Sequence, residues 1–391
     1  MLFDWLKQRE NILALCIALV VLVLHLIIID QVDRNMFDEA HYIPEAKAIL
    51  EGGELGNLEH PPLGKLFIAA GIDLFGDNPW GWRTFSVLFG VASIILFYLI
   101  CQNLTSNRYI PLIATFIFAF ENQSFVQSSV AMLDVYGLTL LLASFWLYLR
   151  GNYISSGIVL ALSVLAKLSG VIGVVAIIGH WLLVRRNEKW KGLKFVIVSP
   201  LAFILLMPAL DWLAIGSLEC PWDRIGFMRE NLSVLTFSNT THDQMSHPWT
   251  WIVSFKPMCF WYKPTYWASP SWTILALIIP SLCYAVYATI KRSSLSLFAI
   301  LWFISTYVSL IAIDLITDRI MFKFYFYPTI GAICLVLGVG IYHLWTLSSK
   351  REDERIRWAI RIPILGFFIA HLVVFAIMSP YCDYGWTTNC G

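Results

Sequence analysis

Charged side chains are rare in this sequence, and they recur at a few points where they could do chemistry. Asp38 and Glu39 follow the first apolar stretch, within the segment Phe-Asp-Glu-Ala-His-Tyr. His60 and Lys65 begin and end the segment His-Pro-Pro-Leu-Gly-Lys. Adjacent carboxylates beside a membrane are costly unless they are hydrated or used. We therefore take the pair as a candidate general base or metal site; the alternative is a hydrated acidic loop.

Four further charged residues stand at the ends of apolar stretches: Arg83, Asp134, Lys167 and Arg319. Cations at such positions suit a phosphate group, and a carboxylate suits a proton acceptor or a divalent metal. Taken singly, each has a simpler interpretation, because long charged side chains extend to water from the end of a membrane helix. Whether the four residues lie at the same depth in the membrane depends on the elements that carry them.

Those elements are membrane helices. The chain has 391 residues, of which 58% are hydrophobic and 14% charged, and its mean hydropathy is +0.70. This composition excludes an ordinary soluble protein, and the net charge of +1 gives no indication of a nucleic-acid partner. A span needs about 20 apolar residues. About eleven such spans are predicted, near 11–29, 82–101, 109–121, 132–149, 153–166, 168–184, 195–215, 271–290, 295–316, 324–347 and 362–379.

The apolar run 153–184 is divided between two of these spans. As one helix it would be about 48 Å long at 1.5 Å per residue, too long for a hydrocarbon core of about 30 Å. Arg150 before it and Arg185 after it should both be cytoplasmic. Two short helices that turn near Lys167 satisfy both conditions and place the lysine at the outer turn.

The positive-inside rule gives the orientation. Clusters of Lys and Arg at 185–194, 291–292 and 350–361 fall on one side, which should be the cytoplasm. We therefore expect a multi-pass cell membrane protein whose N-terminus is cytoplasmic and whose C-terminus is extracytoplasmic. The chain is expected to form a single transmembrane domain, 1–391, with two long outer loops, 30–81 and 216–270. All the candidate residues then lie at the outer interface, and chemistry is expected there.

The two outer loops differ in character. In the first, short interfacial helices are expected at Pro44–Leu50 and after Pro61-Pro62, through Leu74. The second is rich in Trp, Phe and Tyr, which favour the membrane interface and also stack on sugars. Four cysteines face the oxidising side, so three disulfide pairings remain open. They are Cys220, Cys259, Cys382 and Cys390.

The ordered motifs at 37–42, 60–65, Arg83, 132–134 and 166–170 resemble the protein O-mannosyltransferase family, in a compact prokaryotic form. The resemblance covers about 38–167 well and the C-terminal half loosely. It implies an all-α polytopic membrane protein with the GT-C glycosyltransferase fold. It implies transfer of mannose or a related hexose from a polyprenyl or dolichyl monophosphate to Ser/Thr hydroxyls of secreted or membrane proteins, on the extracytoplasmic face.

The resemblance also suggests roles for individual residues. Asp38 corresponds to the family's catalytic base, and Glu39 is its neighbour in the same motif. The substrate-binding positions would be His60, Lys65, Arg83, Asp134, Lys167 and Arg319. Because cations can neutralise a monophosphate leaving group, no metal or other cofactor is required, although Asp134 leaves a divalent ion possible.

Three alternatives remain open. Aminoarabinose transferases with a lipid acceptor share the acidic residue and a Pro-Pro motif, but they usually carry lysine where this chain has His60. A transporter would explain the many spans, but it should place its charges near the bilayer midplane. A non-catalytic lipid-binding protein would keep the cations and would not need Asp38.

Overall fold

The computed structural model describes residues 5, 7–53, 55–56 and 58–381, and most of them are helical. An antiparallel hairpin joins β1 (Cys259–Tyr262) to β2 (Thr265–Trp267). The longer helices are α2 (Arg9–Ile28), α3 (Glu39–Glu51), α4 (Leu63–Phe75), α5 (Pro79–Leu104), α6 (Tyr109–Ala119), α7 (Asn122–Ser129), α8 (Leu133–Leu149), α9 (Tyr153–Ala166), α10 (Gly173–Val184), α11 (Lys189–Ile215), α12 (Pro221–Val234), α13 (Trp272–Ile290), α14 (Ser294–Phe303), α15 (Ser309–Thr317), α16 (Tyr327–Ser349) and α17 (Glu354–Met378). The all-α architecture expected of the chain is confirmed.

By length and composition, seven helices in the described part of the chain could cross a membrane. An eighth span is possible if α7 and α8, which meet at a bend of 117°, count as one. The apolar helices at 109–119, 153–166 and 168–184 are shorter than the usual span. Each of the eleven predicted ranges contains a helix, but the number of eleven spans is not confirmed.

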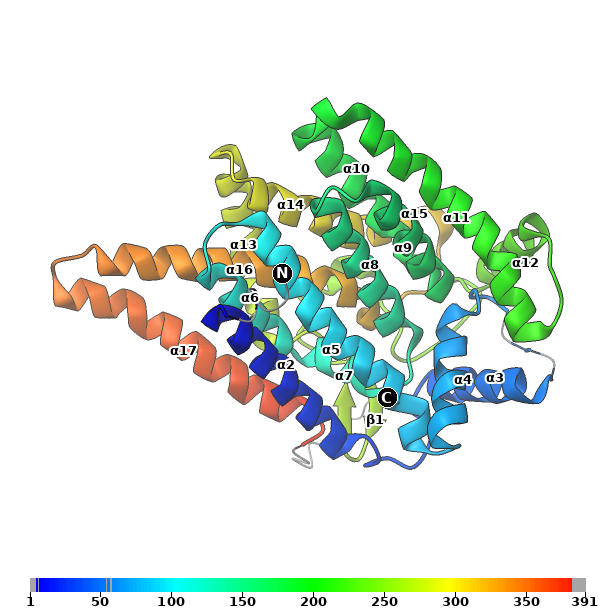
Figure 1. The fold of residues 1–391 in the computed structure, drawn as a ribbon. Helices are drawn as coiled ribbons and strands as arrows, with labels where there is room; N and C mark the ends of the chain where they lie inside the picture. Colours follow the sequence, from blue (N-terminus) through cyan, green and yellow to red (C-terminus); the bar gives the residue numbers. More distant parts are fainter. Residues whose placement is uncertain (1–4, 6, 54, 57, 382–391) are drawn as a thin grey trace.

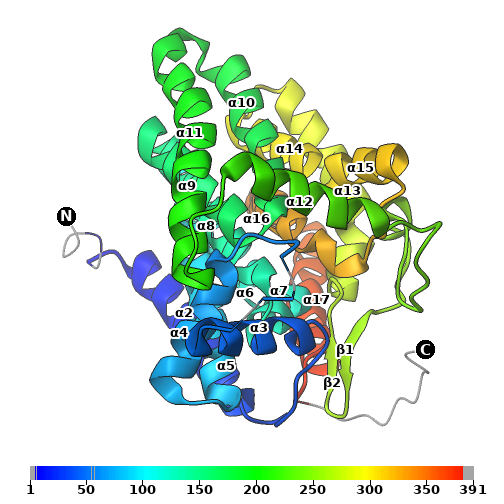
Figure 2. The same cartoon turned by 90° about the vertical axis from the view of Figure 1, so that its right-hand side faces the viewer.

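The ends of the helix bundle differ (Figure 1). The turns between α13 and α14 and between α16 and α17 lie on the left of this view, whereas α3, α4 and α12 lie on the right. Viewed from that right-hand side, α3, α4, α12 and the β hairpin face the reader together (Figure 2). The two long outer loops predicted from the sequence therefore gather at one end of the bundle.

The first of these loops contains the two expected short helices, although α3 is longer than predicted. It begins at Glu39 rather than Pro44 and ends at Glu51, directly before Gly52, whose φ of +68° is readily adopted by glycine. α4 starts directly after Pro62. Gly64 lies so close to α8 and α9 that a Cβ there would be 2.7 Å from a Leu133 methyl and 2.9 Å from the Ala166 carbonyl oxygen. The glycine permits α4 to pack against both.

The predicted break near Lys167 is confirmed. α9 ends at Ala166, Lys167 has an extended backbone, and the 3-10 turn η1 (Leu168–Ile172) leads into α10. Gly170 packs on the last turns of α9, because a Cβ there would lie 2.8 Å from the Ser163 carbonyl carbon. The break thus fixes the backbone from which the Lys167 side chain extends.

Candidate active site

Glu39 and Arg83 form a fully buried ion pair. Arg83 Nε donates to Glu39 Oε1 at 2.9 Å and Nη2 donates to Oε2 at 2.8 Å. The remaining guanidinium N–H groups reach the carbonyls of Ile29, Val32 and Arg34. The carboxylate also accepts from the backbone N–H groups of Met36 and Ala131. Since a guanidinium has five N–H donors, Arg83 is saturated here and has none to offer a phosphate.

The expected substrate-binding Lys65 is also buried in a protein contact. Its Nζ lies 3.2 Å from Glu45 Oε2, and the lysine side chain is fully buried. Burial lowers the pKa of Lys65, and Glu45 opposes that shift. Glu45 Oε1 accepts from the backbone N–H of Gly56, so the pair fixes the segment that leads to His60. Lys65 therefore has a structural role, because through Glu45 it holds the backbone near Gly56.

Asp134 and Lys167 meet across the start of α8 and the end of α9. Lys167 Nζ lies 2.5 Å from Asp134 Oδ2, and both residues are almost wholly buried. The ammonium also lies 5.3 Å and 5.2 Å from the ring centroids of Phe324 and Tyr325. Aromatic faces attract a cation, so the lysine is held in place by a carboxylate and by two rings.

A cavity of about 230 Å³ opens beside this pair. His60, Asp134, Lys167, Arg319 and Tyr325 are among its lining residues. Nδ1 of His60 is buried there without a hydrogen-bond partner among the described residues. Burial lowers the pKa of His60 well below its usual value of 6.5, and the positive charges of Lys167 and Arg319 lower it further. The imidazole is therefore neutral at pH 7.

Asp38 stands at the N-terminus of α3, directly before the buried Glu39. Burial raises its pKa to about 6, while the positive charge of Lys167 opposes this and Asp134 adds to it. The Tyr42 hydroxyl lies 3.5 Å from Asp38 Oδ2. The side chain is half-buried, and no ion pair ties it down among the residues described. Unlike Glu39, Glu45 and Asp134, Asp38 is not engaged in an ion pair among the described residues, so it is our candidate proton acceptor.

The turn before Asp38 is strained. Phe37 has a φ of +46°, which bulky residues rarely adopt. Its ring stacks on Phe260 of β1 at 4.6 Å and meets Phe322 and Phe324 edge-on. Packing against the second outer loop thus holds the backbone that orients Asp38.

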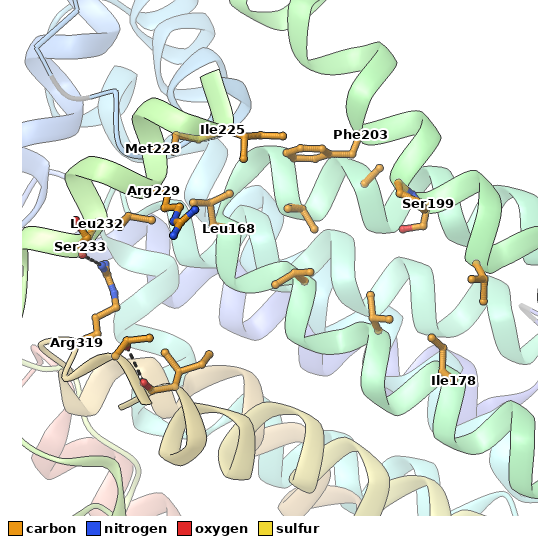
Figure 3. Close-up of a pocket in the computed structure, with 18 of the residues that line it drawn as sticks. Leu168, Ile178, Ser199, Phe203, Ile225, Met228, Arg229, Leu232, Ser233 and Arg319 are labelled. Atoms are coloured by element: carbon orange, nitrogen blue, oxygen red, sulfur yellow. Dashed lines mark hydrogen bonds between the residues drawn. The ribbon is translucent and has the colours of Figure 1, made fainter. Parts of the chain in front are cut away.

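A long apolar groove of about 870 Å³ runs away from the polar cavity. Its walls come from α9, α10, α11, α12 and α15. The groove extends from Ile178 at one end to Arg229 and Arg319 at the other (Figure 3). Leu168, Val171, Leu232, Ile313 and Arg319 line both spaces. Arg319 thus stands where the apolar groove meets the polar cavity, and its Nη1 donates to the Leu232 carbonyl at 3.1 Å.

Of the predicted residues, the structure brings His60, Asp134, Lys167 and Arg319 to one cavity. Asp38 is not among its lining residues, but it lies near enough to Lys167 and Asp134 for their charges to affect its pKa. Glu39, Lys65 and Arg83 lie instead in buried ion pairs. Sequence reasoning did not identify Tyr42, Tyr325 or the apolar groove. An apolar residue that lines a groove has the same sequence signal as one that faces lipid, whereas Tyr42 could have been suggested by its position one helical turn after Asp38.

Cys220 is an exposed free cysteine, and Cys259 is a buried residue of β1. Cys382 and Cys390, for which disulfides were considered, lie outside the described residues.

Residues 59–212 match the family model described as dolichyl-phosphate-mannose-protein mannosyltransferase. The polyprenol-phosphate-mannose–protein mannosyltransferase of Mycolicibacterium smegmatis is 34% identical over 116 residues, which cover 28% of this chain and 22% of that protein. The protein of the same name from Corynebacterium glutamicum is 24% identical over 308 residues, covering 58% of this chain and 59% of the relative. The chain spans less than two thirds of either relative.

The undecaprenyl phosphate-α-4-amino-4-deoxy-L-arabinose arabinosyl transferase of Pseudomonas aeruginosa is 27% identical over 234 residues, covering 54% of this chain and 41% of the relative. Among solved structures, the protein O-mannosyltransferase Pmt1-Pmt2 complex of S. cerevisiae bound to the sugar donor matches with a TM-score of 0.76 at 12% identity. That match covers 97% of this chain and 90% of the other and shows a shared fold. These matches confirm the GT-C fold of this multi-pass membrane chain and its resemblance to the protein O-mannosyltransferase family.

Proposed function

We propose that this chain transfers mannose, or a related hexose, from a polyprenyl monophosphate to a Ser or Thr hydroxyl of a secreted or membrane protein. The observation that carries the proposal is the position of Arg319 at the junction of the apolar groove and the polar cavity. The order along this path is apolar groove, cation and polar cavity, which matches the order of apolar tail, phosphate and sugar in a lipid-linked sugar donor. Two relatives that match parts of the chain are named polyprenol-phosphate-mannose–protein mannosyltransferase.

The donor would place its isoprenoid tail in the groove and its phosphate near Arg319 and Lys167. Two cations close to a monophosphate stabilise it as it leaves, because they compensate the charge that develops on the bridging oxygen. Lys167 is already ordered by Asp134 and the rings of Phe324 and Tyr325, so little reorganisation is needed. Arg83 and Glu39 would act indirectly, since their pair holds the start of α3.

The sugar would occupy the polar cavity. Neutral His60, with Nδ1 unpartnered among the described residues, can exchange a hydrogen bond with a sugar hydroxyl. Asp38 would accept the proton of the attacking hydroxyl as the new bond to the anomeric carbon forms and the bond to the phosphate oxygen breaks. The released product is the polyprenyl phosphate.

No metal is needed in this scheme, because Lys167 and Arg319 supply the positive charge. Asp134, the residue that left a divalent ion possible, has one carboxylate oxygen against Lys167. We therefore expect transfer to survive chelation of divalent ions by EDTA. A loss of activity that Mg²⁺ or Mn²⁺ restores would contradict this part of the proposal.

We further propose that the site opens on the extracytoplasmic face, with the N-terminus in the cytoplasm. The basic clusters of the sequence support this orientation, since residues 291–292 and 350–353 lie at turns far from α3 and α12 (Figure 1). The acceptor would then be a translocated protein that reaches Asp38 from the outer surface.

A second candidate is transfer to a lipid acceptor, as the match to the Pseudomonas aeruginosa enzyme suggests. The discriminating experiment incubates purified protein with radiolabelled polyprenyl-phosphate-mannose and either Ser/Thr peptides or lipid A. Label in the peptides supports the first function, and label in the lipid supports the second. Absence of label in both acceptors, with donor shown to bind, would contradict mannose transfer to either class.

A further inference from the structure

The segment that carries Arg319 is not helical, and its conformation depends on the second outer loop. Phe237 N donates to the Asp318 carbonyl at 2.8 Å, and Ile320 N donates to the Leu235 carbonyl at 3.0 Å. Farther along, Ser246 N donates to the Met321 carbonyl at 2.9 Å. Residues 235–237 and 246 therefore hold 318–321 through backbone hydrogen bonds, with isolated antiparallel bridges between Thr236 and Arg319 and between Met245 and Phe322. A shift of this loop would move the backbone of Arg319.

One residue within that loop, His247, connects it to α15, the helix before Arg319. His247 Nδ1 lies 2.9 Å from Oδ2 of Asp314, a residue of α15 that is 3% exposed. The imidazole stacks on Trp249 at 4.3 Å and lies 4.1 Å from the ring of Phe237. Asp314 is one helical turn before Asp318. His247 thus contacts both Phe237 of the outer loop, which pairs with the Arg319 segment, and Asp314 of α15, the helix that precedes that segment.

We propose that His247 is a positioning residue for the donor phosphate and acts through Arg319. This inference rests on the proposed function, in which Arg319 binds that phosphate. His247 is absent from the lining of both the groove and the polar cavity, so an effect on the donor must be indirect. Asp314 is buried, and a buried carboxylate that loses its hydrogen-bond partner is strongly destabilised. Without His247, Asp314 and the adjoining Arg319 segment must rearrange toward water.

The test measures binding of two probes to purified full-length protein in lipid nanodiscs: a polyprenyl monophosphate and the corresponding polyprenol. His247→Ala is expected to raise the dissociation constant of the phosphate about tenfold, the loss of one charge-assisted contact, and to leave that of the polyprenol unchanged. His247→Asn should restore most of the affinity, because the asparagine amide nitrogen can take the place of Nδ1. His343→Ala is the matched control. His343 also forms a side-chain hydrogen bond, with the Tyr284 hydroxyl, but it lies near the C-terminal end of α16, whereas Arg319 precedes the N-terminal end of that helix.

A double mutant separates positioning from general stability. Contacts that act through one residue are not additive, so adding His247→Ala to Arg319→Gln should change the phosphate affinity less than about twofold. A full tenfold further loss, or an equal loss of polyprenol binding, would overturn the inference. So would a His247→Ala variant that binds like wild type while Arg319→Gln does not.

Failure of the proposed function gives a different result, because Arg319→Gln alone would then leave phosphate binding unchanged. Should His247→Ala not yield folded protein, Asp314→Asn provides the second variant. It keeps the side-chain volume and an acceptor oxygen but removes the charge, and it is expected to raise the phosphate dissociation constant about fivefold. Unchanged phosphate binding in Asp314→Asn would then overturn the inference.

Discussion

Lys167 and Asp134 show how a charged pair can serve a site at the edge of a membrane. The lysine is nearly buried, yet its ammonium borders the polar cavity as well as the Asp134 carboxylate. A lysine that merely extends to water would be exposed at its tip. The geometry favours a cation kept in place for an anionic ligand, and this distinction can be measured.

Lys167→Gln is expected to lower kcat/KM for the lipid donor at least tenfold, because a charge-assisted hydrogen bond contributes about 1.5–3 kcal/mol. The KM of the acceptor should barely change, and Arg319→Gln should behave in the same way. Steady-state kinetics at varied donor concentration provide the measurement. Lys350→Gln, at an exposed turn, is the control. Unchanged donor kinetics in Lys167→Gln would remove the lysine from the phosphate site.

The ionisation of Asp38 gives a prediction about pH. Burial raises its pKa to about 6, and a general base must be ionised to accept a proton. The kcat/KM for transfer should therefore fall as the pH decreases through about 6 and stay level above it. Because Asp134 raises this pKa, Asp134→Asn should move the midpoint to lower pH. A flat profile from about pH 5 to 8, or a shift in the opposite direction, would contradict the assignment.

At the scale of elements, the sequence predicted positions of helices better than partnerships between charges. The break at Lys167 followed from the length of the apolar run and the arginines that flank it. By contrast, Arg83 was assigned to the donor phosphate, and the structure pairs it with Glu39, 44 residues away. Lys65 similarly meets Glu45. A sequence shows that a charge lies near a membrane, but which opposite charge neutralises it depends on tertiary packing.

The packing of η1 against α9 leads to an element-scale prediction. In Gly170→Ala the new Cβ would lie 2.4 Å from Ser163 Oγ and 2.8 Å from its carbonyl carbon, so the backbone must shift. Because this shift would displace Lys167, the variant should have a lower kcat/KM for the lipid donor, and it should unfold at a lower temperature. Kinetics and thermal unfolding in detergent provide the measurements. Gly366→Ala, where a Cβ meets nothing within 4 Å, should be neutral or slightly stabilising. Equal behaviour of the two variants would contradict the argument.

At the scale of the whole molecule, the basic clusters and the candidate residues are predicted to lie on opposite sides of the membrane. A cysteine introduced at Glu188, between α10 and α11, should react with an impermeant thiol reagent only after the cells are permeabilised. One introduced at Asn231 on α12 should react in intact cells. Both are made in a background whose native cysteines are replaced. Labelling of position 188 from outside would reverse the orientation and move the site to the cytoplasmic face.

The groove is a property of the whole molecule that no local pattern indicates. Its walls come from five helices spread between α9 and α15, and its residues are as apolar as those that face lipid. The cavity is similar, since His60, Lys167 and Arg319 come from three distant segments. Resemblance to a family could suggest that these residues act together. Only the three-dimensional structure shows that they line the cavity whereas Glu39, Lys65 and Arg83 form buried ion pairs.

The central claim is that Asp38 removes the proton of an acceptor hydroxyl in a mannosyl transfer. The direct measurement compares wild type and Asp38→Asn for transfer of radiolabel from polyprenyl-phosphate-mannose to a Ser/Thr peptide, with donor binding measured in parallel. Asp38→Asn should bind the donor normally and lose at least about 10²–10⁴-fold in turnover, the usual contribution of a general base. Near-normal turnover by Asp38→Asn would contradict the account.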